Sequence, residues 1–168
     1  MNCKEDERLV IGKSDPKNHI YDVLLFALCD ITDVTILSYI KKIATAAFSH
    51  SSIEKVFIPS LITEFSERAF YYWHNQKSIE FALDSKLQII EPKSFHSTPI
   101  ERITIPSKLK RICNEAFSSC QSLRHFKIPS DSEFQVIETL NFNSILIESL
   151  SIPASVCEFE DGWCSCAE

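Results

Sequence analysis

The residues from Ile100 to Phe117 read IERITIPSKLKRICNEAF, and most of the 168-residue chain consists of copies of this stretch. The stretch opens with apolar side chains at Ile100, Ile103 and Ile105, and Pro106 follows directly. A second apolar pair and an Ala-Phe dipeptide complete it. Alternating apolar residues over a few positions are typical of a half-buried β-strand, so each copy is predicted to begin with one short strand.

The third apolar position of this pattern recurs at a nearly constant interval. Successive members lie 22 to 24 residues apart, and they are Ile36, Ile58, Phe81, Ile105, Ile128 and Ile152. A period of about 20–29 residues with an L-x-x-L-x-L spacing is typical of leucine-rich repeats. The copy that ends at Phe81 is the weakest, because Gln76 occupies its first apolar position and no proline follows.

Two further columns of apolar residues support the same register. One column contains Phe48, Phe70, Phe95, Phe117 and Phe142. The other lies five residues earlier in each copy and contains Ile43, Phe65, Ile90, Ile112 and Ile137. Two copies carry two extra residues before Leu87 and Phe134, and a solenoid tolerates such loop insertions. We therefore expect the phenylalanines to stack through a continuous core.

These columns predict an α/β repeat fold, namely a leucine-rich-repeat solenoid with a parallel concave β-sheet and short helical or irregular convex segments. Copies one period apart run in the same direction around the coil, so their strands are expected to pair in parallel. The proline after a strand has no N–H to donate and ends the ladder there. Pro92 suits the first turn of a short helical segment on the convex side, where a missing N–H costs nothing.

Two regions are predicted along the chain. Residues 1–30 are expected to form an N-terminal cap with a degenerate first repeat, because Tyr21 and Phe26 are spaced like the two apolar columns. Residues 31–168 are expected to hold about six leucine-rich repeats, of which the last is incomplete. A solenoid needs its end layers covered, and Trp163 is a candidate lid at the far end. The alternative is that the chain is a truncated accessory part of a longer repeat array.

The best copy, ITIPSKLKRICNEAFSSCQSL from Ile103 to Leu123, is similar to the BspA-like leucine-rich repeats, and the similarity extends over roughly residues 31–159. The resemblance implies a non-enzymatic, protein-binding or adhesive module of the surface-antigen type. In that family a glycine often follows the isoleucine of the second column. Here that position holds Ala44, Ser66, Glu91, Cys113, Glu138 and Glu160, so the tight turn must be made in another way.

Strand residues that alternate with the core positions are predicted to line the concave face. They are Asp33, Thr35, Lys55, Phe57, Ser78, Glu80, Arg102, Thr104, His125, Lys127, Ser149 and Ser151. Among them, the candidate binding residues are Lys55, Phe57, Glu80, Arg102, Thr104, His125 and Lys127. The cations make the middle of this face mildly basic, which favours an acidic or polar protein surface as the partner, and an exposed aromatic can anchor an interface. The alternative is a sheet face that is only solvated.

Composition and charge exclude several classes of function. The net charge is −6 and no basic run occurs, so nucleic acid is not expected as a partner. The charged N-terminus lacks the apolar core of a secretory signal, and no apolar run approaches the roughly 20 residues that span a bilayer. The sequence therefore predicts a cytoplasmic location, whereas the family resemblance allows the cell surface. With 2 glycines the chain has no glycine-rich phosphate loop, and neither catalytic residues nor a cofactor are predicted.

The chain contains 7 cysteines, of which Cys157, Cys164 and Cys166 lie near the C-terminus. An odd number without a signal peptide favours reduced thiols. Cys29 and Cys120 are predicted to be buried like small apolar residues. The C-x-C spacing fits a zinc site poorly, so no metal site is predicted. A thiol or metal-binding protein that uses the C-terminal cysteines is the alternative from another functional class.

Overall fold

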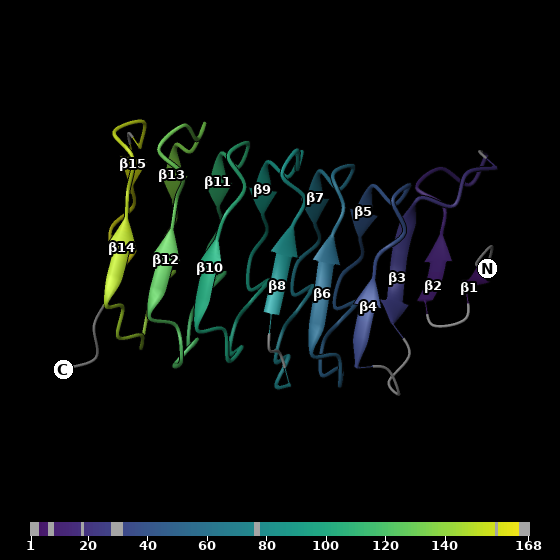
Figure 1. The fold of residues 1–168 in the computed structure, drawn as a ribbon, viewed down its shortest axis with the longest axis horizontal. Coiled ribbons are helices and arrows are strands. Elements are labelled where there is room, and N and C mark those ends of the chain that lie inside the picture. Colours follow the sequence, from purple (N-terminus) through teal and green to yellow (C-terminus); the bar gives the residue numbers. More distant parts are fainter. Residues whose placement is uncertain are drawn as a thin grey trace.

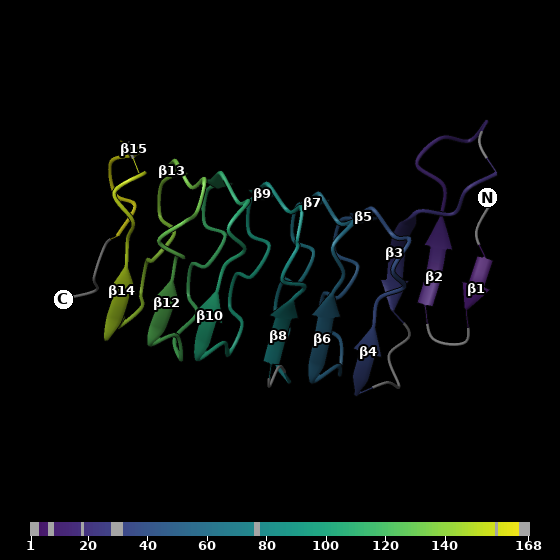
Figure 2. The ribbon, with the colours of Figure 1, turned by 45° about the horizontal axis from the view of Figure 1, so that its top comes forward.

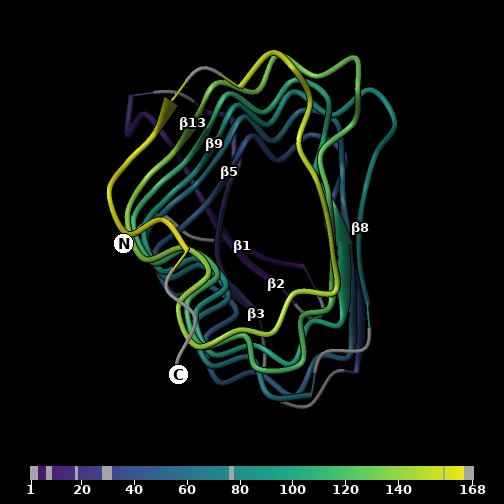
Figure 3. The same cartoon turned by 90° about the vertical axis from the view of Figure 1, so that its left-hand side faces the viewer.

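The computed structural model is a solenoid of stacked, similar turns (Figure 1). It describes residues 4–6, 9–17, 19–27, 32–75, 78–156 and 158–164. Viewed along the long axis, successive turns superpose on one closed outline with strands on two opposite walls (Figure 3). The strands follow one another in sequence order from β1 (Lys4–Asp6) at one end to β14 (Ser149–Ser151) and β15 (Glu158–Phe159) at the other, in both ribbon views (Figures 1 and 2).

Six parallel strands, one in each turn, form the first wall. They are β4 (Asp33–Thr35), β6 (Lys55–Ile58), β8 (Ser78–Phe81), β10 (Arg102–Thr104), β12 (His125–Lys127) and β14 (Ser149–Ser151). Their parallel direction confirms the prediction, as does the alternation of buried and exposed residues in β6 and β10. They form two sheets, β4–β6–β8 and β10–β12–β14, rather than one. We call the outward side of these six strands the repeat-strand face.

The opposite wall consists of two-residue strands where helical segments were expected. They are β5 (Lys42–Ile43), β7 (Glu64–Phe65), β9 (Ile89–Ile90), β11 (Arg111–Ile112), β13 (Val136–Ile137) and β15 (Glu158–Phe159). They continue the order of a nine-stranded sheet that starts with β1 (Lys4–Asp6), β2 (Leu9–Gly12) and β3 (Val23–Ala27). None of the described residues lies in a helix, so the predicted helical convex segments, including the one at Pro92, are wrong for this part of the chain. The described part accordingly offers no helix that could span a membrane.

Left-handed residues in the turns after these short strands explain why no helix forms there. Ten non-glycine residues of the described part have φ between 52° and 60°, and they are Ala46, His50, Arg68, Tyr72, Lys93, Ser97, Glu115, Ser119, Leu140 and Ser144. An α-helix needs φ near −63° at consecutive residues. The N–H groups of nine of these residues bond to the next turn instead, as from Arg68 to the Pro92 carbonyl at 3.1 Å and from Tyr72 to the His96 carbonyl at 3.1 Å. These bonds offset the roughly 1–2 kcal/mol that a left-handed conformation costs a residue with a Cβ.

The same turns show how the chain manages without the glycine seen in similar repeats. The residues at that position, from Ala44 to Glu138, are not left-handed in the turns described. The first left-handed residue of each turn comes two positions later, for example at Ala46 and Glu115. A glycine directly after the second column is therefore not required by this backbone.

Antiparallel strands replace the regular pattern at the N-terminal end. β1 pairs with β2 and β2 with β3 in antiparallel fashion, whereas β3 pairs with β5 in parallel. Leu24 lies beside Ile43 in this register, so the prediction that Tyr21 belongs to that column is wrong. Phe26 does not join the phenylalanine column either, since it is 45% exposed on β3. β1 and β2 cross the space outlined by the turns (Figure 3), and the division at residue 30 stays a prediction.

The core follows the predicted columns through the whole solenoid. The five phenylalanines of the column and the five residues of the second column are fully buried. Ring centroids in the phenylalanine column lie 4.8 to 6.3 Å apart at small interplanar angles, so the predicted stack is confirmed. Trp163 packs edge-on against Phe142 at 5.9 Å, which extends the aromatic core into the last described turn.

Candidate binding face

The predicted candidate residues lie on the repeat-strand face, divided between its two sheets. In the first sheet Phe57 lies beside Glu80, and in the second Thr104 lies beside Lys127 and Arg102 beside His125. Lys55, Phe57, Glu80, Arg102, Thr104 and Lys127 are exposed, whereas His125 is half-buried. Asp33, which was also predicted on this face, is described only as part of the backbone of β4.

Three cations of this face lack the ion pairs that several cations on the opposite wall make. Lys55, Arg102 and Lys127 form no ion pair with any described residue. On the opposite wall Arg111 binds Glu138 at 3.0 Å, and Lys42 binds Glu64 across neighbouring strands. The positive charges of the repeat-strand face are therefore available to a ligand.

Phe57 is a large apolar residue on this otherwise polar surface. It is 40% exposed and lies in register with Thr35 on one side and Glu80 on the other. The ring is therefore partly accessible to a ligand. Removing such a ring from water on binding is favourable at about 25 cal/mol per Å² of apolar surface.

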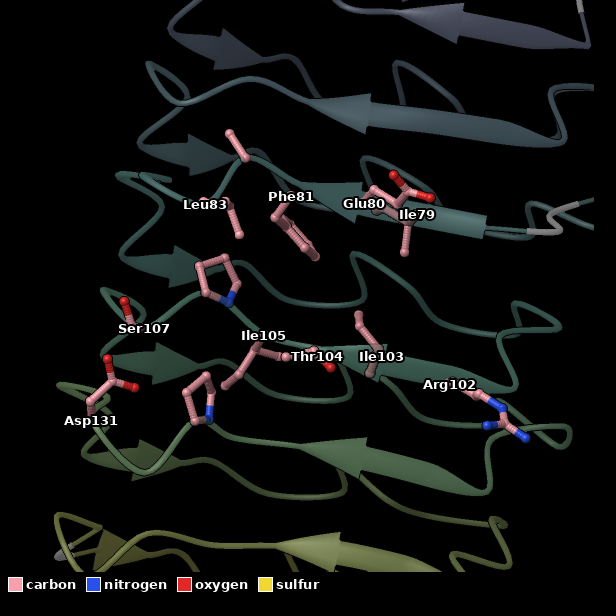
Figure 4. A pocket seen from close by; sticks show the side chains of 13 residues that line it. Ile79, Glu80, Phe81, Leu83, Arg102, Ile103, Thr104, Ile105, Ser107 and Asp131 are labelled. Atoms are coloured by element: carbon pink, nitrogen blue, oxygen red, sulfur yellow. The ribbon is translucent and has the colours of Figure 1, made fainter.

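A break between β8 and β10 divides the face, and sequence reasoning did not predict it. No strand pairing links these two fully described strands. Their ribbons stand further apart than those of the other neighbours in this wall (Figure 1). A hollow of about 540 Å³ lies between them (Figure 4). Lys55, Phe57 and Glu80 thus belong to one sheet, and the other candidates belong to the second.

The weak repeat at Phe81 is the sequence signal that coincides with this break. This copy has Gln76 in place of an apolar residue and Ala82 in place of proline. Phe81 is only partly buried, whereas the equivalent Ile58 and Ile105 are fully buried. The turn that contains β8 is therefore held less firmly against the turn that follows it.

A second, smaller hollow of about 280 Å³ lies where β10 and β12 begin. It is lined by Glu101, Arg102, Ser122, Arg124 and His125. Arg124 donates to the Gln121 carbonyl at 2.7 Å and approaches Glu148 at 3.8 Å, so its guanidinium is partly neutralised. Arg102 borders both hollows, and its charge is unpaired among the described residues.

Two buried thiols are unsuited to act as nucleophiles. Burial raises the pKa of Cys120 to about 11, and burial together with the nearby Glu138 and Glu91 carboxylates raises the pKa of Cys113 to about 12. Cys120 is buried as predicted, with its Sγ donating to the Phe95 carbonyl at 3.0 Å. Cys29 lies outside the described residues.

The C-terminal cysteines lie mostly beyond what the structure describes. Cys164 is exposed, and Cys157 and Cys166 fall outside the described residues. Within the described part, no three His, Cys, Asp or Glu side chains gather in a way that could hold a metal ion. The alternative of a thiol or metal-binding protein thus stays a prediction.

Comparison with known families identifies the repeat. The model of the BspA type leucine rich repeat region, with six copies, matches residues 20–123 and 41–167. No curated protein matches the chain significantly.

Solved structures with the same fold are longer than this chain. The pneumococcal vaccine antigen PcpA is similar with a TM-score of 0.81 and 22% identity, over 95% of this chain and 46% of that one. A leucine rich cell surface protein from Faecalibacterium prausnitzii A2-165 is similar with a TM-score of 0.62 and 18% identity, over 95% of this chain and 51% of that one. A leucine-rich repeat protein from Bacteroides ovatus ATCC 8483 is similar with a TM-score of 0.55 and 17% identity, over 94% of this chain and 55% of that one. The chain spans about half the length of these structures.

Proposed function

Because the chain belongs to the BspA-type leucine-rich repeat family, we propose that it is a non-enzymatic protein-binding module that binds through the repeat-strand face. The observation that carries the proposal is the set of cations without ion pairs at Lys55, Arg102 and Lys127, together with the exposed ring of Phe57 on the same strand as Lys55. Interfaces are anchored by aromatic and arginine side chains that become desolvated on binding.

The charge of this face favours an acidic or polar partner surface. The whole chain has a net charge of −6, so an acidic protein is repelled elsewhere and attracted at this face. Complementary charge raises the association rate and orients the encounter, and salt weakens both effects. Adhesion at a cell surface is the setting that the relatives' descriptions as a vaccine antigen and a cell surface protein suggest.

A pull-down with a matched pair of variants tests this function. The purified chain is the bait, and two prey pools are offered, the organism's own lysate and host-cell or extracellular-matrix protein. The test variant is Lys55→Glu/Phe57→Ala/Arg102→Glu. The control is Lys17→Glu/Lys86→Glu/Leu146→Ala, which makes the same types of change at exposed residues outside the face.

The expected result is a partner that the unchanged chain and the control retain and the test variant loses, while all three melt similarly. The pool that supplies the partner distinguishes an adhesive role from one inside the cell. Retention of every partner by the test variant would remove the repeat-strand face as the binding surface.

A further inference from the structure

Backbone groups of β8 point into the break without a partner. The N–H groups of Ser78 and Ala82 donate to carbonyls of the preceding turn at 3.1 and 2.9 Å. Alternate residues of a strand direct their backbone groups to opposite neighbours. The N–H and C=O groups of the intervening Ile79 and Phe81 are therefore directed toward β10, and no described residue bonds to them there.

β10 has a matching set of unpaired backbone groups on the other side of the break. Ile105 donates to the Lys127 carbonyl at 3.0 Å, and the Glu101 carbonyl accepts from the turn of β12. The backbone groups of the intervening Arg102 and Thr104 are directed toward β8 and are likewise unpaired within the described part. The middle of this wall thus holds two strand edges that face each other, and unpaired edges are templates for another strand.

Apolar side chains line part of the space between these edges, beside polar ones that include Glu80 and Thr104. Ile79 and Phe81 border it from one strand and Ile103 and Ile105 from the other (Figure 4). Leu83, which is fully exposed, lies at its rim. On the β8 side the hollow meets Ile79 and Phe81, which are only partly buried, whereas the equivalent Val56 and Ile58 of β6 are buried.

The ends of the hollow differ in charge. Arg102 lies where β10 begins, next to the smaller hollow formed with Arg124 and His125. Asp131 lies at the other end, beyond the C-terminal ends of the strands (Figure 4). A ligand that follows the direction of the strands would meet positive charge first and negative charge last.

The opposite wall keeps the two turns joined. β9 pairs directly with β11, with Ile89 beside Arg111 and Ile90 beside Ile112. The break is consequently confined to the repeat-strand face, and the turns can move apart there while their other side stays bonded. Pairing on both sides of an inserted strand requires spacings near 4.8 Å.

We propose that the break between β8 and β10 accepts an extended segment of a partner protein, which lies parallel to both strands and completes the sheet. The segment bonds to the backbone groups of Ile79, Phe81, Arg102 and Thr104, and one large apolar side chain enters the hollow. Addition of a strand to a free edge is a recurrent mode of peptide recognition, in which the main chain supplies affinity and side-chain pockets supply specificity. The proposal rests on the proposed protein-binding function and specifies its site and its partner.

The same geometry specifies the partner's side chains. Arg102 points outward and Ile105 inward, three residues apart on β10. Successive side chains of a strand point to opposite faces, so the partner's outward acidic residue and its inward apolar residue also need an odd separation. An acidic residue three positions before a phenylalanine or leucine places the carboxylate at Arg102 and the apolar side chain between Phe81 and Ile105. The acidic residue must come first, because Asp131 repels it at the other end.

A fluorescence anisotropy titration with labelled synthetic peptides tests this. The probe is the peptide TSDTTFTS, and the controls are TSFTTDTS, in which the two key residues are exchanged, and TSDTTSTS, which lacks the apolar side chain. A fourth peptide carries N-methyl groups on alternate residues of the probe and so cannot complete the ladder. We expect saturable binding of the probe and binding about tenfold or more weaker for each of the other three.

Two surface variants of the full chain locate the site. Arg102→Glu should weaken binding of the probe by about tenfold or more, whereas Lys17→Glu, the same kind of change at an exposed residue outside both the hollow and the repeat-strand face, should leave it unchanged. Hydrogen exchange gives a readout that does not depend on folding of a variant. The amides of Ile79, Phe81, Arg102 and Thr104 should exchange faster than those of Ser78, Ala82 and Ile105 in the free chain, and should become protected when the probe binds.

Several results would overturn the inference. They are the absence of saturable binding up to about 1 mM peptide, equal binding of probe and controls, and binding without protection of the four amides. Concentration-dependent dimerisation that protects the same amides would identify a second copy of the chain as the occupant instead. If a captured partner is lost on Lys55→Glu/Phe57→Ala but neither competes with the probe nor protects the break, the repeat-strand face stands as a binding surface and only the inserted strand fails.

Discussion

The rings of Phe70 and Phe95 lie face to face in successive turns, with centroids 5.1 Å apart and an interplanar angle of 6°. Phe48 covers the other face of Phe70 at 4.8 Å, and Phe117 covers the other face of Phe95 at 5.2 Å. A ring in the middle of this stack therefore contacts a ring on each side. Its loss removes packing from two neighbouring turns at once.

Phe95→Ala should lower the free energy of unfolding by about 3–5 kcal/mol, because it opens a cavity between two turns. Domains of ordinary size are stable by about 5–15 kcal/mol, so the variant should unfold at much lower urea concentration. Phe26→Ala is the control, since the same side chain is half-exposed there and should cost much less. Urea unfolding followed by circular dichroism measures both. Equal losses would contradict the role of the stack.

Ala46→Gly should stabilise the chain by about 0.5–1 kcal/mol, because Ala46 is exposed and has φ of 56°, a conformation that glycine adopts without strain. Ala44→Gly should destabilise it by a similar amount, since Ala44 is not left-handed and glycine only adds entropy to the unfolded chain. The two melting temperatures should move in opposite directions. A shift of both in the same direction would show that the turn is not held as described.

Asn141→Ala should destabilise the chain by about 1–3 kcal/mol, because it removes buried hydrogen bonds to the backbone of two turns. The Asn141 Oδ1 accepts from the Ala116 N–H at 3.0 Å, and its Nδ2 donates to the Glu138 carbonyl at 2.9 Å. Asn114→Ala removes an exposed amide that bonds to the Thr139 hydroxyl and should cost less. Chemical denaturation of both variants compares them directly, and a smaller loss at Asn141 would contradict this account.

Asp22 should make stability depend on pH. Burial alone raises its pKa, but hydrogen bonds from the Ser14 N–H and hydroxyl, each 2.9 Å long, and the nearby Lys41 outweigh burial and lower the pKa overall. A carboxyl group whose pKa is lowered in the folded state stabilises the fold at pH values above its unfolded pKa of about 3.9. This stabilisation is lost as the pH falls through the folded-state pKa. The stability lost on Asp22→Asn should therefore be largest near neutral pH and shrink below about pH 4. A difference that grows on acidification would contradict the sign.

Cys113 and Cys120 should resist alkylation in the native state. Their raised pKa values, about 12 and about 11, keep the thiols protonated at pH 8, and both side chains are buried. Peptide mapping by mass spectrometry after iodoacetamide treatment should find both unmodified in buffer and modified in urea. Rapid native modification of Cys120 would mean that its turn opens readily.

The columns of apolar residues were predictable because each reports on contact with a common core. Phe70, Phe95 and Phe117 repeat at a nearly constant interval, and any chain wound with this interval brings them together. The left-handed residues were not predictable, because Arg68 and Glu115 carry no mark of that conformation in their chemistry. Without them a short helix was the natural expectation, and two-residue strands are too short to show any alternation.

The outward positions of the candidate site were predictable for the same reason as the core, since alternation places Lys55 and Arg102 opposite the buried residues. The break was not, because it depends on how two successive turns pack against each other. Gln76 and Ala82 mark a weak repeat in the sequence, but only the arrangement of neighbouring turns shows that strand pairing is missing there.

The uninterrupted pairing from β9 to β11 behind the divided face has a mechanical consequence. The paired strands β9 and β11 act as a hinge opposite the break. A change in the distance between β8 and β10 therefore bends the whole solenoid. Each half then acts as a lever arm, and a small displacement beside Phe81 is amplified at the distant ends. Binding of a segment in the break would thus change the distance between the first and last turns.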